Sequence, residues 1–120
     1  MWIYSQSTGQ LLNPNGAYVA TGYSGFADAK NDPNREQDKN LGPIPRGQWQ
    51  MIEKFDSASH GPFCIRLWPS SDTDCFNRDG FLVHGDSIKN PGTASHGCII
   101  LPRTIREMLW KSTDKWIDVV

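Results

Sequence analysis

Short apolar runs separated by turn-forming residues mark the first part of the chain. Residues 2–4 and 10–12 flank a polar stretch that ends in Gly9, which is typical of a β-hairpin. A second turn, at residues 13–16, precedes a third short run over residues 17–21. The pattern therefore predicts three short β-strands at the N-terminus.

Two stretches in the middle of the chain alternate as a strand with one mostly apolar face does. Residues 48–55 place Trp49 and Met51 two positions apart, and residues 63–68 repeat the pattern around Ile65. Three shorter apolar runs fit buried strands, at residues 81–83, 99–101 and 116–120. The chain is thus expected to contain about eight short strands.

One helix is clearly marked. Residues 104–107, Thr-Ile-Arg-Glu, match a capping box, and Ile105, Met108 and Leu109 fall on one helical face. The helix should occupy roughly residues 103–111. With no repeats and no shift in composition, we expect residues 1–120 to form a single, mainly β domain with this one helix.

Residues 22–41 form a long polar stretch between the predicted strands. A loop of this length is uncommon in a compact domain unless it lines a binding site or is mobile. Both readings stay open, and for residues 30–40 the alternative is a mobile surface loop. The next segment, residues 42–47, contains two prolines and is expected to be stiff and extended.

Composition excludes several functional classes. The chain has a net charge of −1 and its 12 basic residues form no run, so a nucleic-acid partner is not expected. No apolar stretch is long enough to insert into a membrane. The N-terminal residues lack the basic start and apolar core of a signal peptide.

Three cysteines leave one thiol unpaired if the other two are joined. Cys64 and Cys75 are separated by a turn-like segment and could form a disulfide, which would leave Cys98 free. The alternative is that all the thiols stay reduced, as in a cytosolic protein. Sequence alone does not choose between the two.

Residues 84–98 concentrate the reactive side chains of the chain. His84-Gly85-Asp86 opens the segment and Ser95-His96-Gly97-Cys98 closes it, so that two imidazoles and a thiol occur within fifteen residues. Such a group is typical of a cysteine nucleophile with a histidine base, or of a metal site.

Roles within this segment follow from what an attacking thiol needs. Cys98 is the candidate nucleophile, His84 its base, and His96 a group that orients the thiol or binds substrate. The N–H groups of Gly97 and Cys98 could stabilise an oxyanion, and Gly97 would let a substrate approach the backbone. If the strand ending at His84 lies beside the one starting at Ile99, thiol and imidazole meet at one end of a sheet.

These motifs resemble the signature of the L,D-transpeptidases, in which a His-Gly pair is followed by Ser/Thr-His-Gly-Cys. The wider chain is similar to a compact branch of that family, the toxic effectors injected by type VI secretion. Three further stretches carry this likeness, Ser7-Thr8-Gly9, Gly22-Tyr23-Ser24-Gly25 and Gly42-Pro43-Ile44-Pro45-Arg46-Gly47. In one departure, Ile100 stands where the family usually has a polar Arg or Asn, a role that could pass to Arg103.

The resemblance implies an enzyme that acts on the peptide stems of peptidoglycan without a cofactor. Cys98 would attack the bond between meso-diaminopimelate and D-Ala, and the thioester would pass to water or to the amine of a D-amino acid. The candidates to contact substrate are Tyr23, Ser24, Asp86, Ser87 and Ser95. Asp86 could instead orient His84.

By the same resemblance, the protein would be made in the cytoplasm and act in the periplasm of a target bacterium. Its expected protein partners are an immunity protein and a component of the secretion apparatus.

Two other functions remain open at this point. The first is a zinc peptidase with His84, Asp86, His96 and Cys98 as ligands. The second is a non-enzymatic module whose exposed aromatic residues bind wall saccharides or a protein, drawn from Trp2, Tyr4, Tyr18 and Tyr23. A papain-like amidase is disfavoured because its cysteine usually precedes its histidine, whereas here His84 precedes Cys98.

Overall fold

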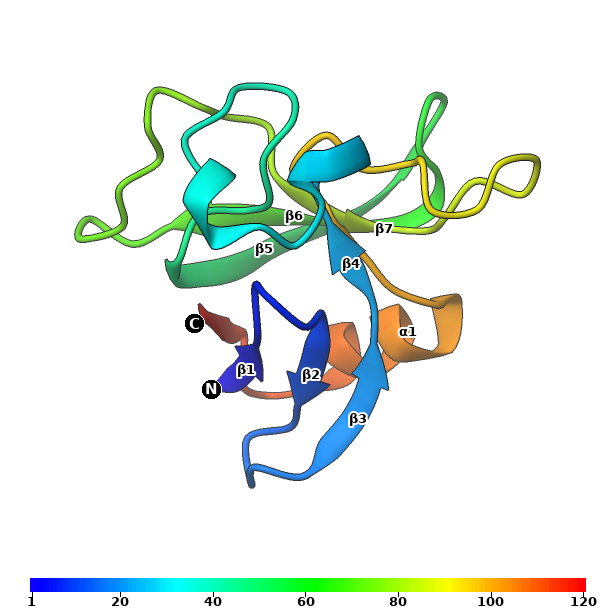
Figure 1. The fold of residues 1–120 in the computed structure, drawn as a ribbon. Helices are drawn as coiled ribbons and strands as arrows, with labels where there is room; N and C mark the ends of the chain where they lie inside the picture. The colour runs from blue at the N-terminus through cyan, green and yellow to red at the C-terminus, as the bar shows by residue number, and fades with distance from the viewer.

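The fold, described for all 120 residues by a computed structural model, is built on a single sheet of nine strands (Figure 1). The first four strands are β1 (Trp2–Tyr4), β2 (Gln10–Leu12), β3 (Tyr18–Thr21) and β4 (Tyr23–Ser24). The others are β5 (Gly47–Ser57), β6 (Gly61–Pro69), β7 (Leu82–His84), β8 (Ile99–Ile100) and β9 (Trp116–Val119). Their order across the sheet is β3-β2-β1-β9-β5-β6-β7-β8-β4. The expectation of a mainly β fold with one α-helix is confirmed.

The long β5–β6 hairpin lies at the centre of the sheet and carries much of the core. Trp49 of β5 and Ile65 of β6 are fully buried, and Val83 of β7 packs with them in one cluster of 15 buried residues. Burying such large apolar side chains is the main favourable contribution to folding. The predicted alternation in these strands therefore identified the core correctly.

The only α-helix, α1 (Arg103–Lys111), packs against β6 and β7 through its buried face, which includes Leu109. Its bounds agree with the prediction, but the capping box is wrong. Pro102 is the N-cap and makes no side-chain cap bond, so Thr104 already lies inside the helix. Glu107, expected to complete the box, forms an ion pair with Arg103 instead.

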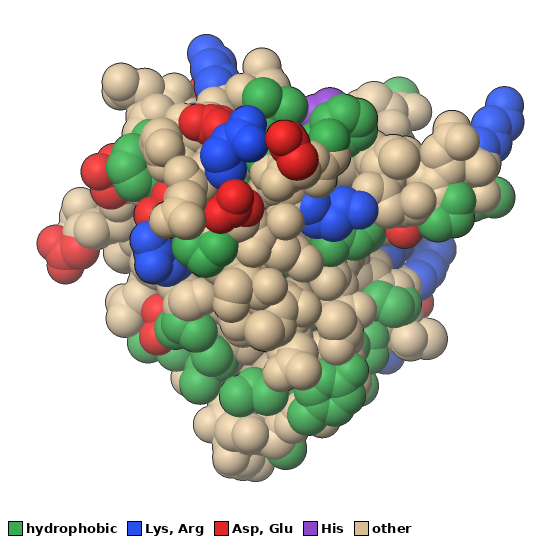
Figure 2. All heavy atoms as spheres, viewed as in Figure 1, with side chains coloured by type: hydrophobic (Ala, Val, Ile, Leu, Met, Phe, Trp, Pro, Cys, Tyr) green, Lys and Arg blue, Asp and Glu red, His purple; other side chains and the backbone are tan.

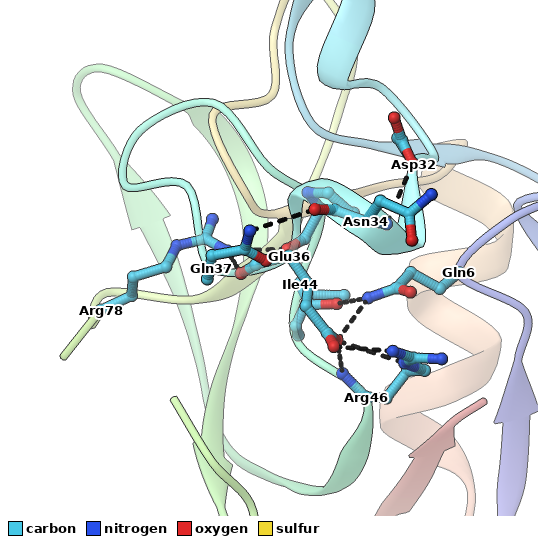
Figure 3. A network of polar contacts seen from close by, with 9 residues as sticks. Gln6, Asp32, Asn34, Glu36, Gln37, Ile44, Arg46 and Arg78 are labelled. Carbon is cyan, nitrogen blue, oxygen red and sulfur yellow. Dashed lines mark hydrogen bonds and ion pairs between the residues drawn. The ribbon is translucent and has the colours of Figure 1, made fainter. Parts of the chain in front are cut away.

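Residues 22–41 are more structured than predicted. They include β4, which pairs with β8, and two short 3-10 helices, η1 (Ala27–Ala29) and η2 (Pro33–Arg35). In Figure 3, the carboxylate of Glu36 accepts hydrogen bonds from Gln6 and Arg46. These bonds attach residues 30–40 to the rest of the fold, so this stretch is packed against the domain rather than projecting from it.

The connection between β7 and β8 brings the two ends of the reactive segment together. The strands are parallel neighbours, with Val83 opposite Ile99 and His84 opposite Ile100. The condition under which thiol and imidazole would meet, that the strand ending at His84 lies beside the one starting at Ile99, is therefore met. The intervening residues leave the sheet as a loop, drawn in yellow beside the green tip of the β5–β6 hairpin in Figure 1.

The surface does not support a row of exposed N-terminal aromatics. Trp2 and Tyr4 are buried, with relative exposures of 3% and 0%, and only Tyr18 of that set is largely exposed. Figure 2 shows acidic and basic side chains intermingled on one face, with no large area of a single sign. No helix of the structure has the length and apolar character needed to cross a membrane.

All three cysteines are free thiols in the structure. The disulfide between Cys64 and Cys75, one of two possibilities raised by the sequence, is not formed. Cys64 is instead a buried residue of β6.

Candidate active site

A cavity of about 160 Å³ opens at the end of β7 and holds the four residues expected to take part in catalysis. Those four are His84, His96, Gly97 and Cys98. The remaining lining residues come from four separate segments of the chain and are Lys39, Asn40, His60, Arg78, Asp79, Gly80, Phe81 and Ala94. The structure therefore assembles the predicted residues in one place, with a wall that the sequence did not indicate.

Cys98 is half-buried just before β8, with its sulfur against the neighbouring strand. The Leu82 N–H donates to Sγ at 3.3 Å, and the thiol points to the carbonyl of Gly80 at 3.8 Å. Burial raises the pKa of Cys98 to about 11, although the Leu82 N–H and nearby Arg78 act in the opposite direction. At neutral pH the resting group is therefore a thiol that needs a base before it can attack.

His84 is held by its own backbone. Its Nδ1 lies 2.8 Å from the carbonyl oxygen of Gly85, which can only accept, so Nδ1 carries the proton. This leaves Nε2 with a free lone pair. The ring is 2% exposed, and burial lowers the pKa of His84 to about 4, with smaller contributions from His60 and Arg106. The imidazole is therefore neutral at pH 7 and able to accept a proton.

No hydrogen bond joins His84 to Cys98, although the two line the same cavity. Catalytic hydrogen bonds are often long or absent in a protein without substrate and shorten when substrate binds. The arrangement is thus a neutral thiol next to a neutral imidazole, not an ion pair.

His96 is exposed and attached to the loop that precedes β5. Its Nδ1 lies 3.0 Å from the carbonyl oxygen of Asn40, and its ring stacks on Phe26 with 4.8 Å between centroids. These contacts join His96 to residues 26–40, which the sequence left as a mobile loop or the wall of a binding site. The second possibility is the one that the structure favours.

Gly97 is bonded to the backbone support around Cys98. Its N–H donates to Ser95 Oγ at 3.1 Å, and that hydroxyl donates to the Cys98 carbonyl at 2.6 Å. The Gly97 amide is therefore not free to bind an oxyanion, which leaves the Cys98 N–H of the predicted pair. Gly97 has φ +139°, and a Cβ there would lie 2.5 Å from Nη2 of Arg78, so only glycine fits.

Ser24 and Ser95 are both fully buried, and their hydroxyls bond within the protein. Ser24 donates to the Gly97 carbonyl at 3.0 Å and accepts from the Ile44 N–H at 2.8 Å. Ser95 also accepts from the Gly25 N–H at 2.9 Å. The two serines were expected to contact substrate, but their contacts are those of residues that support the backbone around Cys98.

Tyr23 and Asp86 bond to each other at the base of the loop between β7 and β8. The Tyr23 hydroxyl donates to Asp86 at 2.6 Å and accepts from the Ala94 N–H at 3.0 Å. Burial alone would raise the pKa of Asp86, but bonds from Tyr23, Gly92 and Ser87 hold it below its ordinary value. Asp86 thus anchors the loop, while the Gly85 carbonyl orients His84.

A second cavity, of about 570 Å³, lies between this loop and the β5–β6 hairpin tip. It shares His60, His84, Ala94 and His96 with the first cavity, so the two adjoin and are together called the cleft. Ser87 lines this part, its hydroxyl accepting from the Asn90 N–H at 3.0 Å. An elongated substrate could therefore lie on both sides of His84.

The four side chains considered as zinc ligands do not converge. No group of three His, Cys, Asp or Glu side chains is arranged to hold a metal ion. Asp86 accepts hydrogen bonds from Tyr23 of β4 and from the N–H groups of Ser87 and Gly92 in its own loop, and His96 is attached to Asn40. The geometry therefore contradicts the zinc-site hypothesis.

Sequence reasoning missed three residues of the site. Arg78 is buried beside Cys98 and donates to the carbonyls of Gly42 and Pro43, each at 2.8 Å. Arg106 is buried beside Gly85, and His60 stacks on His84. Only His60 could have been suspected, as the third histidine.

Arg103, to which the role of the polar residue missing at position 100 could pass if that role is not vacant, lies away from the thiol. Its side chain pairs with Glu107 on the exposed side of α1 and does not line the cavity that holds Cys98. The charged side chain next to the thiol is Arg78, which no pattern in the sequence indicated.

The fold is similar to that of solved L,D-transpeptidases. An Enterococcus faecium L,D-transpeptidase with a cysteine-to-serine substitution superposes with a TM-score of 0.60 at 15% identity, covering 99% of this chain and 48% of that one. One from Stackebrandtia nassauensis gives 0.59 at 17%, covering 99% and 54%. The present chain thus spans about half the length of these two proteins.

The catalytic domain of the E. faecium enzyme, solved by NMR, matches over nearly its whole length. Its TM-score is 0.52 at 17% identity, with 99% of this chain and 95% of that domain covered. At such identities the likeness establishes the fold. No curated protein matches the sequence. The sequence profile of the Tlde1 domain, however, matches residues 18–116. The chain therefore belongs to the Tlde1 domain family.

Proposed function

We propose that this protein is a cysteine enzyme that modifies peptidoglycan, acting as an L,D-carboxypeptidase, an L,D-transpeptidase or both. The observation that carries the proposal is the single cavity in which a half-buried thiol, Cys98, faces the same space as a neutral imidazole, His84. The family and the fold support a wall peptide as substrate.

In the proposed acylation step, Cys98 attacks the carbonyl carbon of the L-centre of meso-diaminopimelate in its bond to D-Ala. Nε2 of His84 takes the thiol proton as the S–C bond forms. The C–N bond then breaks, and the imidazolium returns the proton to the leaving amine of D-Ala. The product is a thioester on Cys98 and free D-Ala.

Deacylation reverses the proton path. His84 takes a proton from water or from the amine of a D-amino acid, which attacks the thioester carbonyl and releases the Cys98 thiol. Water gives the shortened stem, and an amine gives an exchanged stem. The Cys98 N–H is the donor proposed for the oxyanion in both steps, and His96 would hold the substrate at the outer wall.

Mass spectrometry of soluble tetrapeptide muropeptides after incubation with the protein tests this reaction. The wild type should remove one D-Ala, or replace it when a second D-amino acid is supplied. Cys98→Ala should lose the activity by at least about a thousandfold. Cys75→Ala, which removes a half-buried thiol that does not line this cavity, should keep it. Unchanged products with Cys98→Ala would refute the cysteine mechanism.

The effector role and the site of action are part of the same proposal. We infer that the producer delivers this protein through type VI secretion into a target bacterium, where it acts in the periplasm. The producer itself would make an immunity protein against it. A version exported to the periplasm of a test bacterium should stop growth, and the cytoplasmic version should not. Exported Cys98→Ala should be harmless. Growth arrest by this variant would show that toxicity does not depend on the enzymatic activity of Cys98.

A further inference from the structure

His60 lies outside the reactive segment and has no task in the proposed mechanism. It stands at the tip of the β5–β6 hairpin, where the Ser57 hydroxyl oxygen accepts from the N–H groups of Ser59 at 3.3 Å and His60 at 3.1 Å. These local bonds shape the turn that carries its side chain over the end of β7.

The imidazole of His60 lies against that of His84. Their ring centroids are 4.5 Å apart and the planes differ by 29°, which is a stacked arrangement. Both rings line both parts of the cleft. His84 is only 2% exposed although a cavity opens beside it, and the ring of His60 covers one of its faces.

The groups around His84 come from four different parts of the fold. His60 faces it from the hairpin and Arg106 from α1, and both disfavour an imidazolium. Asp86, in the loop after β7, favours it, and the Cys98 thiol shares the cavity. Burial has the largest influence and lowers the pKa of His84 to about 4. Any residue that covers the ring therefore also keeps it neutral.

We propose that His60 is a positioning residue that covers the His84 imidazole, keeps its Nδ1 on the Gly85 carbonyl and thereby directs Nε2 into the cleft. The proposal rests on the function proposed above, because it takes His84 as the base. The contact itself can be measured without any substrate.

Removing the ring of His60 should raise the pKa of His84. Water that reaches the exposed face of His84 hydrates the imidazolium, so the pKa rises from about 4 toward the ordinary value of 6.5. The ring can also turn and exchange the Gly85 carbonyl for water, which misdirects Nε2. A phenylalanine ring at position 60 should prevent both changes, and it has no nitrogen that could transfer a proton.

Two variants and a control test this inference. His60→Ala removes the cover, His60→Phe keeps a ring in its place, and Ala58→Ser changes an exposed residue of the same turn. NMR titration of the His84 ring gives its midpoint in each protein. We expect an upward shift of about one pH unit or more in His60→Ala and almost none in the other two.

Release of D-Ala by the same proteins gives the second measurement. In His60→Ala, kcat at pH 6 should fall about tenfold with little change in KM, because the base is misplaced and partly protonated. His60→Phe and Ala58→Ser should stay near wild type. Rescue by phenylalanine distinguishes covering the ring from acid–base chemistry at position 60.

Each remaining outcome has a definite meaning. An unchanged His84 midpoint in His60→Ala overturns the proposal whatever the enzyme does. Equal losses of kcat in His60→Ala and His60→Phe overturn it as well, since His60 would then act through its own nitrogens. If the His84 titration midpoint shifts in His60→Ala but the wild type releases no D-Ala, His60 does cover His84 and the function proposed above is overturned.

Discussion

The two sides of the cleft are built differently, although a buried arginine stands on each. On the thiol side, Cys98 and Gly97 lie among loops, and Arg78 donates to the carbonyls of Gly42 and Pro43. On the imidazole side, His84 ends a strand within the sheet. There Arg106 of α1 donates to the carbonyls of Pro62 and Phe63 in β6 and of Leu101 after β8.

Neither arginine has a carboxylate partner, and the hydrogen bonds of both cations go to main-chain oxygens only. The elements joined by Arg106 also hold one another through sheet ladders and packing. The loops joined by Arg78 have no such ladder. The comparison teaches that side-chain hydrogen bonds, from Arg78, Ser24 and Ser95, hold the thiol side, whereas a sheet ladder also holds the imidazole side.

The largest expected effect comes from replacing these two arginines. Arg78→Met leaves two buried carbonyls and two part-buried ones without donors, which should lower the free energy of unfolding by about 4 kcal/mol. Arg106→Met, which affects one buried carbonyl and two part-buried ones, should cost about 2–3 kcal/mol. Urea denaturation measures both.

Hydrogen exchange in the same variants sharpens the comparison. Arg78→Met should increase exchange over residues 36–43 and 96–97, and Arg106→Met over residues 62–63 and 101. Equal losses of stability with the same exchange pattern would show that the two sides do not differ as described.

Next in size is a pH effect confined to the imidazole side. Because burial lowers the pKa of His84 from 6.5 to about 4, the unfolded chain binds a proton in this range that the folded one does not. Stability is therefore complete above about pH 6.5 and should fall by about 3 kcal/mol as the pH decreases to 4. Urea denaturation across this range should show the loss in wild type and a smaller one in His84→Gln. Identical slopes would contradict the burial of a neutral imidazole.

Two glycines offer a matched test of the two sides. Gly97→Ala puts a Cβ 2.5 Å from Arg78 Nη2 at φ +139°, and should cost about 2 kcal/mol. At Gly85 the backbone has no positive φ, and a Cβ would lie 3.1 Å from Arg106 Nη1. Gly85→Ala should thus cost less than about 1 kcal/mol. Thermal unfolding of both variants checks the order, and a larger loss for Gly85→Ala would reverse the comparison.

The smallest effect is expected where the loop after His84 is anchored. Tyr23→Phe removes the donor to Asp86 and the acceptor of the Ala94 N–H, and should lower stability by about 1 kcal/mol. Tyr18→Phe is the matched control, since its exposed hydroxyl bonds only to Thr21 within the same strand. It should change unfolding by less than about 0.5 kcal/mol. Equal effects in the two variants would mean that the Tyr23–Asp86 bond does not stabilise the loop.

Much of the fold could be predicted because its strands have their own local pattern. Alternating residues such as Trp49 and Met51 identified the central strand, since burial on one face imposes a period of two. Strand β4 was missed because two residues carry no period and its partner, β8, lies about 75 positions away. The capping box failed because Pro102, with its fixed φ, is the N-cap and begins the helix two residues earlier than Thr104 would.

The candidate site was predictable in part for a related reason. His84 and Cys98 stand directly beside short apolar runs, so their location at strand ends followed from local sequence. The environment of both side chains did not. Arg78 and His60 reach the cleft from separate loops, and no local pattern in the sequence indicates that Arg78 is buried or that His60 stacks on His84.

The sequence by itself determined which reactive groups this protein has and that they stand at the ends of short strands, because short-range patterns decide where strands begin and end. That these strands, β7 and β8, are neighbours was decided by the tertiary structure. Only the tertiary structure decided the state of those groups. The thiol of Cys98 and the imidazole of His84 are neutral because residues distant in sequence exclude water from both. Desolvation depends on everything packed around a group, and that information is not contained in residues 84–98 alone.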